Sequence, residues 1–66
     1  MTIVVNGEKR ELPPGATLRM LIEQLGLGSK ACAAEVNRQL VPKAQHHTKP
    51  LKDGDSVELV TLVGGG

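Results

Sequence analysis

The side chains best suited to chemistry in this 66-residue chain are one cysteine and two histidines. A thiol becomes a nucleophile when a cation, a histidine or a helix N-terminus lowers its pKa. Cys32 with His46 or His47 would therefore describe a small thiol enzyme. The alternation in ACAAEVN, however, places Cys32 on the same strand face as Ala34 and Val36, which predicts a buried thiol. We regard the enzyme as the weaker interpretation.

The same histidines are the first candidates for a metal site. Adjacent residues of an extended segment point in opposite directions, and a structural zinc site needs about four ligands. Cys32 is the only cysteine that could join His46 and His47. Asp53-Gly54-Asp55 resembles the start of a calcium loop, but the later oxygen ligands of such a loop are missing. We predict a turn at 53–55, with Gly54 at positive φ, and no metal site.

A third candidate is the end of the chain, where Gly64, Gly65 and Gly66 follow an apolar stretch of strand character. Glycine loses more conformational freedom on folding than any other residue, so three glycines after a last strand add nothing to a fold. A segment without Cβ atoms can, however, pass through a narrow channel into the active site of another protein. We predict that the reactive group is the α-carboxylate of Gly66, carried on a flexible arm of Gly64 and Gly65.

An arm of this kind needs a surface that positions it. If Val57, Leu59 and Thr61 of the final strand face the core, then Val60 and Leu62 point to the opposite side. Apolar residues on an outer face directly before the arm indicate a docking surface. The residues predicted to bind the partner are Val60, Leu62 and Val63.

The composition excludes several classes of ligand. The 8 Lys and Arg residues and the 7 Asp and Glu residues are scattered, and Phe, Tyr and Trp are absent. Nucleic-acid surfaces need clustered cations, and single-strand binders add aromatic platforms. No apolar run approaches the roughly 18 residues of a membrane span, and no signal peptide is recognisable at the start. We expect a small cytoplasmic domain that contacts neither nucleic acid nor membrane.

The elements that would position these residues begin with a hairpin and a helix. Residues 2–12 predict two strands joined by a tight Asn6-Gly7 turn, with a charged second strand at a sheet edge. The run TLRMLIEQLGLG predicts a helix with Thr17 as N-cap and Gly26 as the left-handed residue after its end. Its apolar stripe consists of Leu18, Leu21, Ile22 and Leu25.

The second half of the chain predicts three more extended segments. A strand at 32–36 leads through an Asn37-Arg38 turn into a short strand that ends at Pro42. A polar, irregular segment at 43–49 follows, and the final strand runs from Val57 to about Val63. The intervening elements allow the first and last strands to lie adjacent and parallel.

Together these elements indicate an α+β protein with the ubiquitin-like β-grasp fold. We expect a mixed sheet of four to five strands with one main helix packed across it. The predicted domain is 1–63, and the predicted flexible tail is 64–66.

The chain resembles a known family in four stretches: VVNGE, TLRMLIEQLG, AAEVNRQLVPK and LKDGDSVELVTLVGGG. Over nearly its whole length it resembles the small ubiquitin-like sulfur carriers of bacterial thiamine biosynthesis. The run ACA departs mildly from a family pattern that is richer in valine.

The resemblance implies a protein co-substrate rather than an enzyme. A partner adenylating enzyme would use Mg-ATP to convert the Gly66 carboxylate into an acyl-adenylate. Sulfur from a persulfide donor would displace AMP and leave a thiocarboxylate, and thiazole synthase would take this sulfur into the thiazole ring of thiamine. The chain itself would bind no cofactor.

Two other interpretations stay open. The same chemistry can supply molybdopterin synthesis or tRNA thiolation. A non-covalent β-grasp binding module would not need its terminal glycines.

Overall fold

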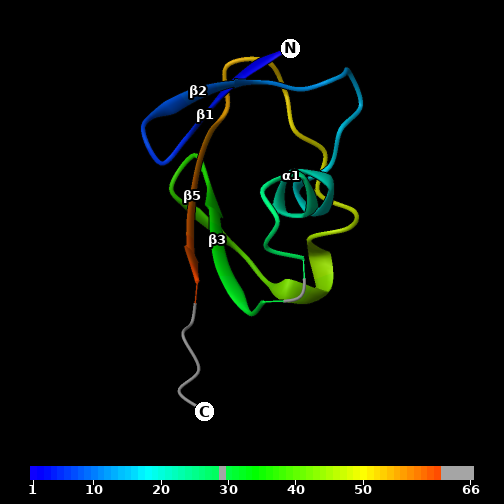
Figure 1. The fold of residues 1–66 in the computed structure, drawn as a ribbon, viewed down its shortest axis with the longest axis vertical. Coiled ribbons are helices and arrows are strands. Elements are labelled where there is room, and N and C mark those ends of the chain that lie inside the picture. Colours follow the sequence, from blue (N-terminus) through cyan, green and yellow to red (C-terminus); the bar gives the residue numbers. More distant parts are fainter. Residues whose placement is uncertain (29, 62–66) are drawn as a thin grey trace.

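Five strands form one mixed sheet, and helix α1 lies across one of its faces (Figure 1). The computed structural model describes residues 1–28 and 30–61. In chain order the elements are β1 (Thr2–Val5), β2 (Glu8–Glu11), α1 (Leu18–Gln24), β3 (Cys32–Val36), β4 (Gln39–Val41), the 3-10 helix η1 (Lys43–Gln45) and β5 (Ser56–Thr61).

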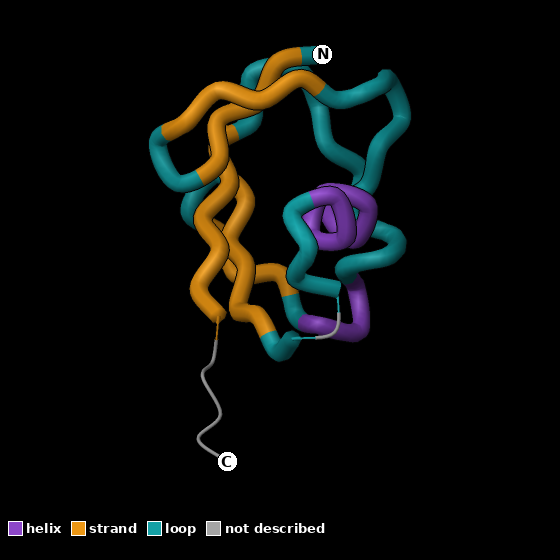
Figure 2. The backbone as a smooth tube through the Cα atoms, viewed as in Figure 1, coloured by secondary structure: helices purple, strands orange, loops and turns teal. Residues whose placement is uncertain are grey.

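The strands lie in the order β2-β1-β5-β3-β4. β1 and β5 pair in parallel, whereas β1–β2, β3–β4 and β3–β5 pair antiparallel. Figure 2 shows the strands on one side of the molecule, with α1 and η1 on the other. This arrangement confirms the predicted β-grasp architecture, with β5 at its centre.

Both hairpins turn at the residues that the sequence predicts, and these residues lie in the left-handed region. Asn6 and Gly7 have φ values of 49° and 85°, and Asn37 and Arg38 have φ values of 51° and 68°. Two consecutive residues at positive φ give a turn whose twist matches that of the flanking strands. Asparagine tolerates this conformation better than most residues that carry a Cβ atom.

The amides of both turn asparagines extend the hydrogen bonding of β5. Asn6 Oδ1 accepts from the Leu59 N–H at 2.9 Å, and Asn6 Nδ2 donates to the Leu59 carbonyl at 3.1 Å. Asn37 Oδ1 accepts from the Ser56 N–H at 3.0 Å, while Asn37 Nδ2 donates to Asp55 at 3.0 Å. Each hairpin therefore holds the central strand by a side chain as well as by its own strand.

Helix α1 is capped at both ends as predicted. Thr17 has an extended backbone, and its hydroxyl accepts from the Met20 N–H at 3.3 Å. Beyond the helix, Gly26 takes φ 77°, and the Leu27 N–H donates to the Ile22 carbonyl at 3.0 Å. This is the long bond of a Schellman motif, which satisfies a carbonyl at the end of the helix.

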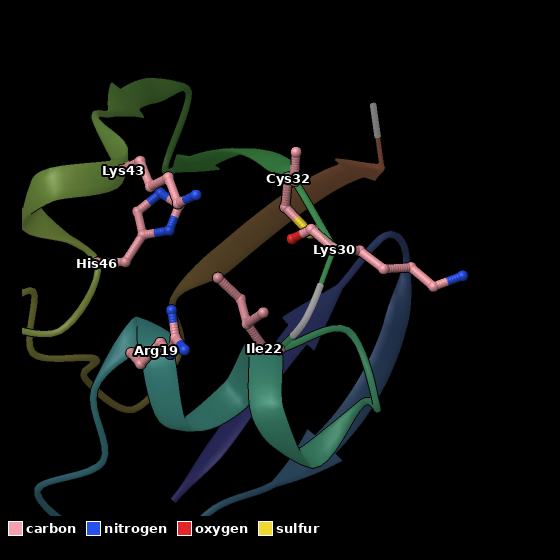
Figure 3. A pocket seen from close by; sticks show the side chains of 8 residues that line it. Arg19, Ile22, Lys30, Cys32, Lys43 and His46 are labelled. Carbon is pink, nitrogen blue, oxygen red and sulfur yellow. The ribbon is translucent and has the colours of Figure 1, made fainter. Parts of the chain in front are cut away.

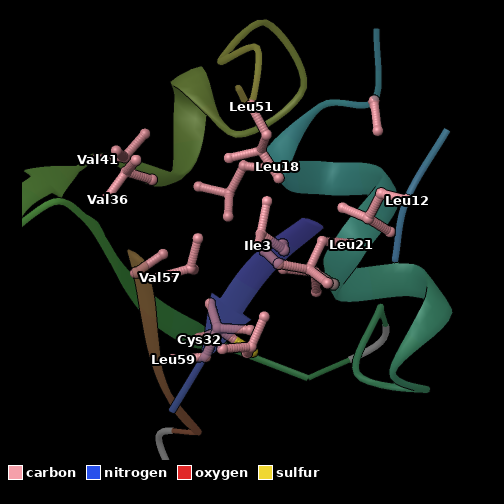
Figure 4. Close-up of a cluster of buried hydrophobic side chains, with 14 residues drawn as sticks. Ile3, Leu12, Leu18, Leu21, Cys32, Val36, Val41, Leu51, Val57 and Leu59 are labelled. Carbon is pink, nitrogen blue, oxygen red and sulfur yellow. The ribbon is translucent and has the colours of Figure 1, made fainter. Parts of the chain in front are cut away.

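The inner faces of the sheet and the helix stripe meet in one core (Figure 4). Several of its members were not identified as core residues from the sequence. β2 ends at Glu11, so that Leu12 turns into the core instead of ending the strand. The core residues are Ile3, Val5, Leu12, Ala16, Leu18, Leu21, Ile22, Cys32, Ala34, Val36, Val41, Leu51, Val57 and Leu59.

The Asn6 amide predicts a measurable loss of stability on substitution. Asn6→Ala removes two hydrogen bonds to Leu59, each worth about 1 kcal/mol, and puts a less tolerant residue at positive φ at about 1 kcal/mol more. We expect the free energy of unfolding in urea to fall by about 2–3 kcal/mol. Asn6→Gly keeps the turn conformation, so its free energy of unfolding should fall only by the contribution of the two amide hydrogen bonds, about 2 kcal/mol. An Asn6→Gly protein as stable as the wild type would show that the amide contributes nothing.

Candidate functional site

The final strand separates its side chains between the two faces of the sheet. Val57 and Leu59 are buried, with 0% and 7% of their surfaces exposed, whereas Val60 is 60% exposed. This confirms that Val60 points away from the core. Thr61 was expected to face the helix but is exposed, since it lies at the end of the sheet beyond the last buried residue of β5.

The predicted reactive end of the chain follows this strand. Leu62, Val63, Gly64, Gly65 and Gly66 lie outside the described residues, and so does the predicted boundary between domain and tail. The last described residue, Thr61, is the register partner of Cys32 at the start of β3. β5 thus brings the chain to one end of the sheet, away from the N-terminus (Figure 1).

The outer face of the sheet is not covered by any element of the described chain, because α1 and η1 lie on the other side (Figure 2). Val60 is the register partner of Ala33, and Glu58 is the register partner of Glu35. Leu40 of β4 lies beside Glu35 and is 68% exposed. The sequence interpretation missed Leu40, although its alternation with the buried Val41 could have indicated an outward position.

A cavity of about 200 Å³ opens between α1, the start of β3 and η1 (Figure 3). Cys32 and His46 reach it from different elements. The Cys32 thiol donates to the Lys30 carbonyl at 3.6 Å. The lining residues are Arg19, Ile22, Gly28, Lys30, Ala31, Cys32, Lys43 and His46.

His46 was expected in an irregular polar segment, but it is buried, with 4% of its surface exposed. Its Nε2 lies 3.0 Å from the Val41 carbonyl. A carbonyl can only accept, so Nε2 carries a proton. The His46 backbone carbonyl also accepts from the Arg19 N–H at 2.9 Å. His46 therefore ties the segment after β4 to both the sheet and the helix, while His47 is exposed.

Among the hydrogen bonds of the described residues, none joins the Cys32 thiol to the His46 imidazole across this cavity. The Cys32 sulfur and the His46 ring are each bonded to a backbone carbonyl instead of to each other. A nucleophile and its base must lie within hydrogen-bonding distance. The geometry thus supports the interpretation of Cys32 as a packed core residue.

The described residues also contain no group of three or more His, Cys, Asp or Glu side chains placed to hold a metal ion. The Asp53-Gly54-Asp55 stretch is a turn, with Gly54 at φ 87° as predicted. Asp55 Oδ2 accepts from the Lys52 N–H at 2.8 Å. Over residues 1–28 and 30–61, every helix is too short or too polar to cross a bilayer.

Comparison with known proteins gives a consistent family signal. The profile of the ThiS family matches residues 3–66. The sulfur carrier protein ThiS of Thermus thermophilus is 39% identical over 62 residues, which are 94% of this chain and 95% of that protein. A crystal structure of the thiamine biosynthesis protein ThiS from Geobacter metallireducens superposes with a TM-score of 0.82 at 25% identity, over 100% of both chains.

A longer relative contains a segment similar to this chain. The thiazole synthase of Paramagnetospirillum magneticum is 38% identical over 66 residues. These residues are 100% of this chain but only 20% of that protein. The chain therefore spans about a fifth of the length of this relative.

The two histidines give a matched pair of stability tests. His46→Ala removes a buried ring and its hydrogen bond to Val41, so we expect the free energy of unfolding to fall by about 1–3 kcal/mol. His47→Ala removes an exposed ring and should change stability by less than about 0.5 kcal/mol. Urea titrations followed by far-UV circular dichroism measure both. Equal stability of the two variants would contradict the structural role of His46.

Proposed function

The chain belongs to the ThiS family, and on this premise we propose that it is a sulfur carrier of thiamine biosynthesis that holds sulfur on the Gly66 carboxylate. One observation carries the proposal: the family match runs to residue 66 and includes the three glycines. The alignment to the sulfur carrier of Thermus thermophilus, over 95% of that protein, supports it.

A carboxylate is a poor electrophile, and the proposed chemistry activates it. An adenylating enzyme joins the Gly66 carboxylate to the AMP part of Mg-ATP and releases pyrophosphate, which gives the carbonyl carbon a good leaving group. The terminal sulfur of a persulfide then displaces AMP and forms an acyl disulfide. A thiol cleaves this S–S bond, and the thiocarboxylate stays on Gly66. The intermediate is covalent, as in nucleophilic catalysis, although the activating residues belong to the partner.

The role of this chain would be to position its own end. β5 is paired on both sides, to β1 and to β3, so the arm begins from the central strand of the sheet. A fixed origin matters because a misplacement of about 1 Å can cost a factor of 10² in rate. Glycines then allow the last residues to enter a narrow channel.

The thiazole synthase relative favours thiamine over molybdopterin synthesis or tRNA thiolation as the destination of the sulfur. In that protein a segment similar to this chain is part of the same polypeptide as a thiazole synthase. We propose thiazole synthase as the acceptor of the sulfur and a persulfide as its donor. A non-covalent binding module would need neither partner.

We propose that the adenylating enzyme docks on the outer face of the sheet. Val60 supplies an exposed apolar side chain at the end of β5. Leu62 and Val63 follow it in the sequence and belong to the same predicted surface.

Cys32→Ala tests whether the thiol takes part in the transfer. Because Cys32 is buried and its sulfur is bonded to a backbone carbonyl, we expect thiocarboxylate formation at the wild-type rate. Stability should fall by about 1 kcal/mol, a typical cost of a single substitution. Mass spectrometry after incubation with ATP, adenylating enzyme and sulfur donor measures the product. A folded Cys32→Ala protein that gains no sulfur would contradict this assignment.

The decisive test of the proposal is a set of changes at the glycine end. Deleting Gly65 and Gly66 shortens the arm by up to about 7 Å, and adding one residue after Gly66 places its carbonyl in a peptide bond. Gly65→Val adds a branched side chain to the arm. We expect all three proteins to fold and to lose ATP–pyrophosphate exchange with the adenylating enzyme.

The wild type provides the control, because conversion of its carboxylate into a thiocarboxylate adds about 16 Da, as the covalent intermediate requires. Circular dichroism confirms that each variant is folded. Wild-type exchange by the truncated chain would refute the sulfur-carrier proposal and leave the binding module.

A further inference from the structure

Two glutamates face each other near the middle of the outer sheet face. Glu35 of β3 and Glu58 of β5 are register partners, so their Cβ atoms are about 5 Å apart. The neighbours of Glu58 along β5, Val57 and Leu59, are buried, which places the glutamate on the open side. Like charges directly opposite each other destabilise a sheet. The free protein therefore keeps a repulsive pair between β3 and its central strand, β5.

Within residues 1–28 and 30–61, no Lys, Arg or His side chain forms an ion pair with either carboxylate. All Lys, Arg and His side chains lie in the described ranges, and the ion pair formed within those ranges is Arg19–Glu23 on α1. Within the described residues, no ion pair to a basic side chain of the same molecule therefore offsets the repulsion between Glu35 and Glu58.

Exposed apolar side chains flank the acidic pair. Leu40 is the register partner of Glu35 on β4, and Val60 lies two residues beyond Glu58 on β5. Their exposed fractions are 68% and 60%. We call Glu35, Glu58, Leu40 and Val60 the acidic surface. A second copy of this chain is a poor occupant, since it would bring like charges against this surface.

We propose that the acidic surface docks a partner that inserts one basic side chain between Glu35 and Glu58 and covers Leu40 and Val60 with apolar groups. Arginine fits best, because its planar guanidinium presents several donors and can bond to two carboxylates. The inference rests on the proposed function in that this partner is the adenylating enzyme. Binding there holds the chain beside the end of β5, from which the glycine arm is delivered.

This arrangement predicts opposite effects on stability and on binding. Removing one charge relieves the repulsion in the free protein but also removes a partner of the inserted cation. Glu35→Gln and Glu58→Gln should each raise the melting temperature by about 2–5 °C. Each should weaken binding to the adenylating enzyme by about 10-fold. If the two glutamates only kept the protein soluble, neither substitution would weaken binding to the adenylating enzyme.

Glu8→Gln is the matched control, because Glu8 is exposed on the edge strand β2 and is paired with Val5. It removes the same charge from the molecule and should change neither the melting temperature nor the affinity. Differential scanning calorimetry of the free proteins and titration calorimetry with the adenylating enzyme provide the two measurements. Unchanged affinity of Glu35→Gln and Glu58→Gln would overturn the inference, and so would a loss of affinity as large for Glu8→Gln.

Pyrophosphate exchange separates this inference from the function on which it rests. If both hold, the Glu35→Gln/Glu58→Gln protein reaches the wild-type kcat with a KM raised about 10-fold or more, because only docking is affected. Wild-type kcat with an unchanged KM refutes the acidic surface alone. Absence of exchange and of the mass gain with the wild-type chain refutes the proposed function, and the inference falls with it.

Discussion

The pairing of β5 between β1 and β3 is the constraint on which the rest of the structure depends. The two hairpins, β1–β2 and β3–β4, do not pair with each other, and the sheet is continuous only through this strand. Asn6 and Asn37 add side-chain hydrogen bonds to β5 from each hairpin turn. The inner side chains of β5 are buried in the core under α1, whereas its outer side chains form the surface proposed for docking. One strand thus joins the two hairpins, the core and the end of the chain that is proposed to carry the sulfur.

Much of this fold could be predicted from local patterns. The alternation of Ile3 with Val5, the Asn6-Gly7 turn and the helix stripe are each set by neighbouring residues, and each is present in the structure. The residues that escaped prediction depend on distant partners. Leu51 is buried although no periodic segment surrounds it, because its N–H donates to the Ala16 carbonyl at 2.9 Å and holds its loop against the start of the helix. Such contacts have no signature in the sequence around either residue.

In the candidate site, too, features set by neighbouring residues could be predicted, whereas features that depend on distant partners could not. The outward position of Val60 follows from strand alternation and could be predicted. The burial of His46 could not, because its bond to Val41 forms only when the segment after β4 folds back. The sequence around Glu35 or around Glu58 also does not reveal that the two are neighbours. They become neighbours only through the register of β3 and β5, and β4 separates these strands in the sequence. Register is a property of the assembled sheet.

The parallel pairing of β1 with β5 also has a consequence for how the protein is made. The strand at the middle of the sheet is the last of the five to be synthesised. Until it is available, the two earlier hairpins have exposed edges and nothing to join them. Pairing the first strand with the last requires closure of nearly the whole chain, and such non-local contacts slow folding. During synthesis the unfinished chain would present unpaired strand edges of the kind that aggregate or recruit chaperones. The sheet can close only after synthesis has reached the strand that leads to the glycines.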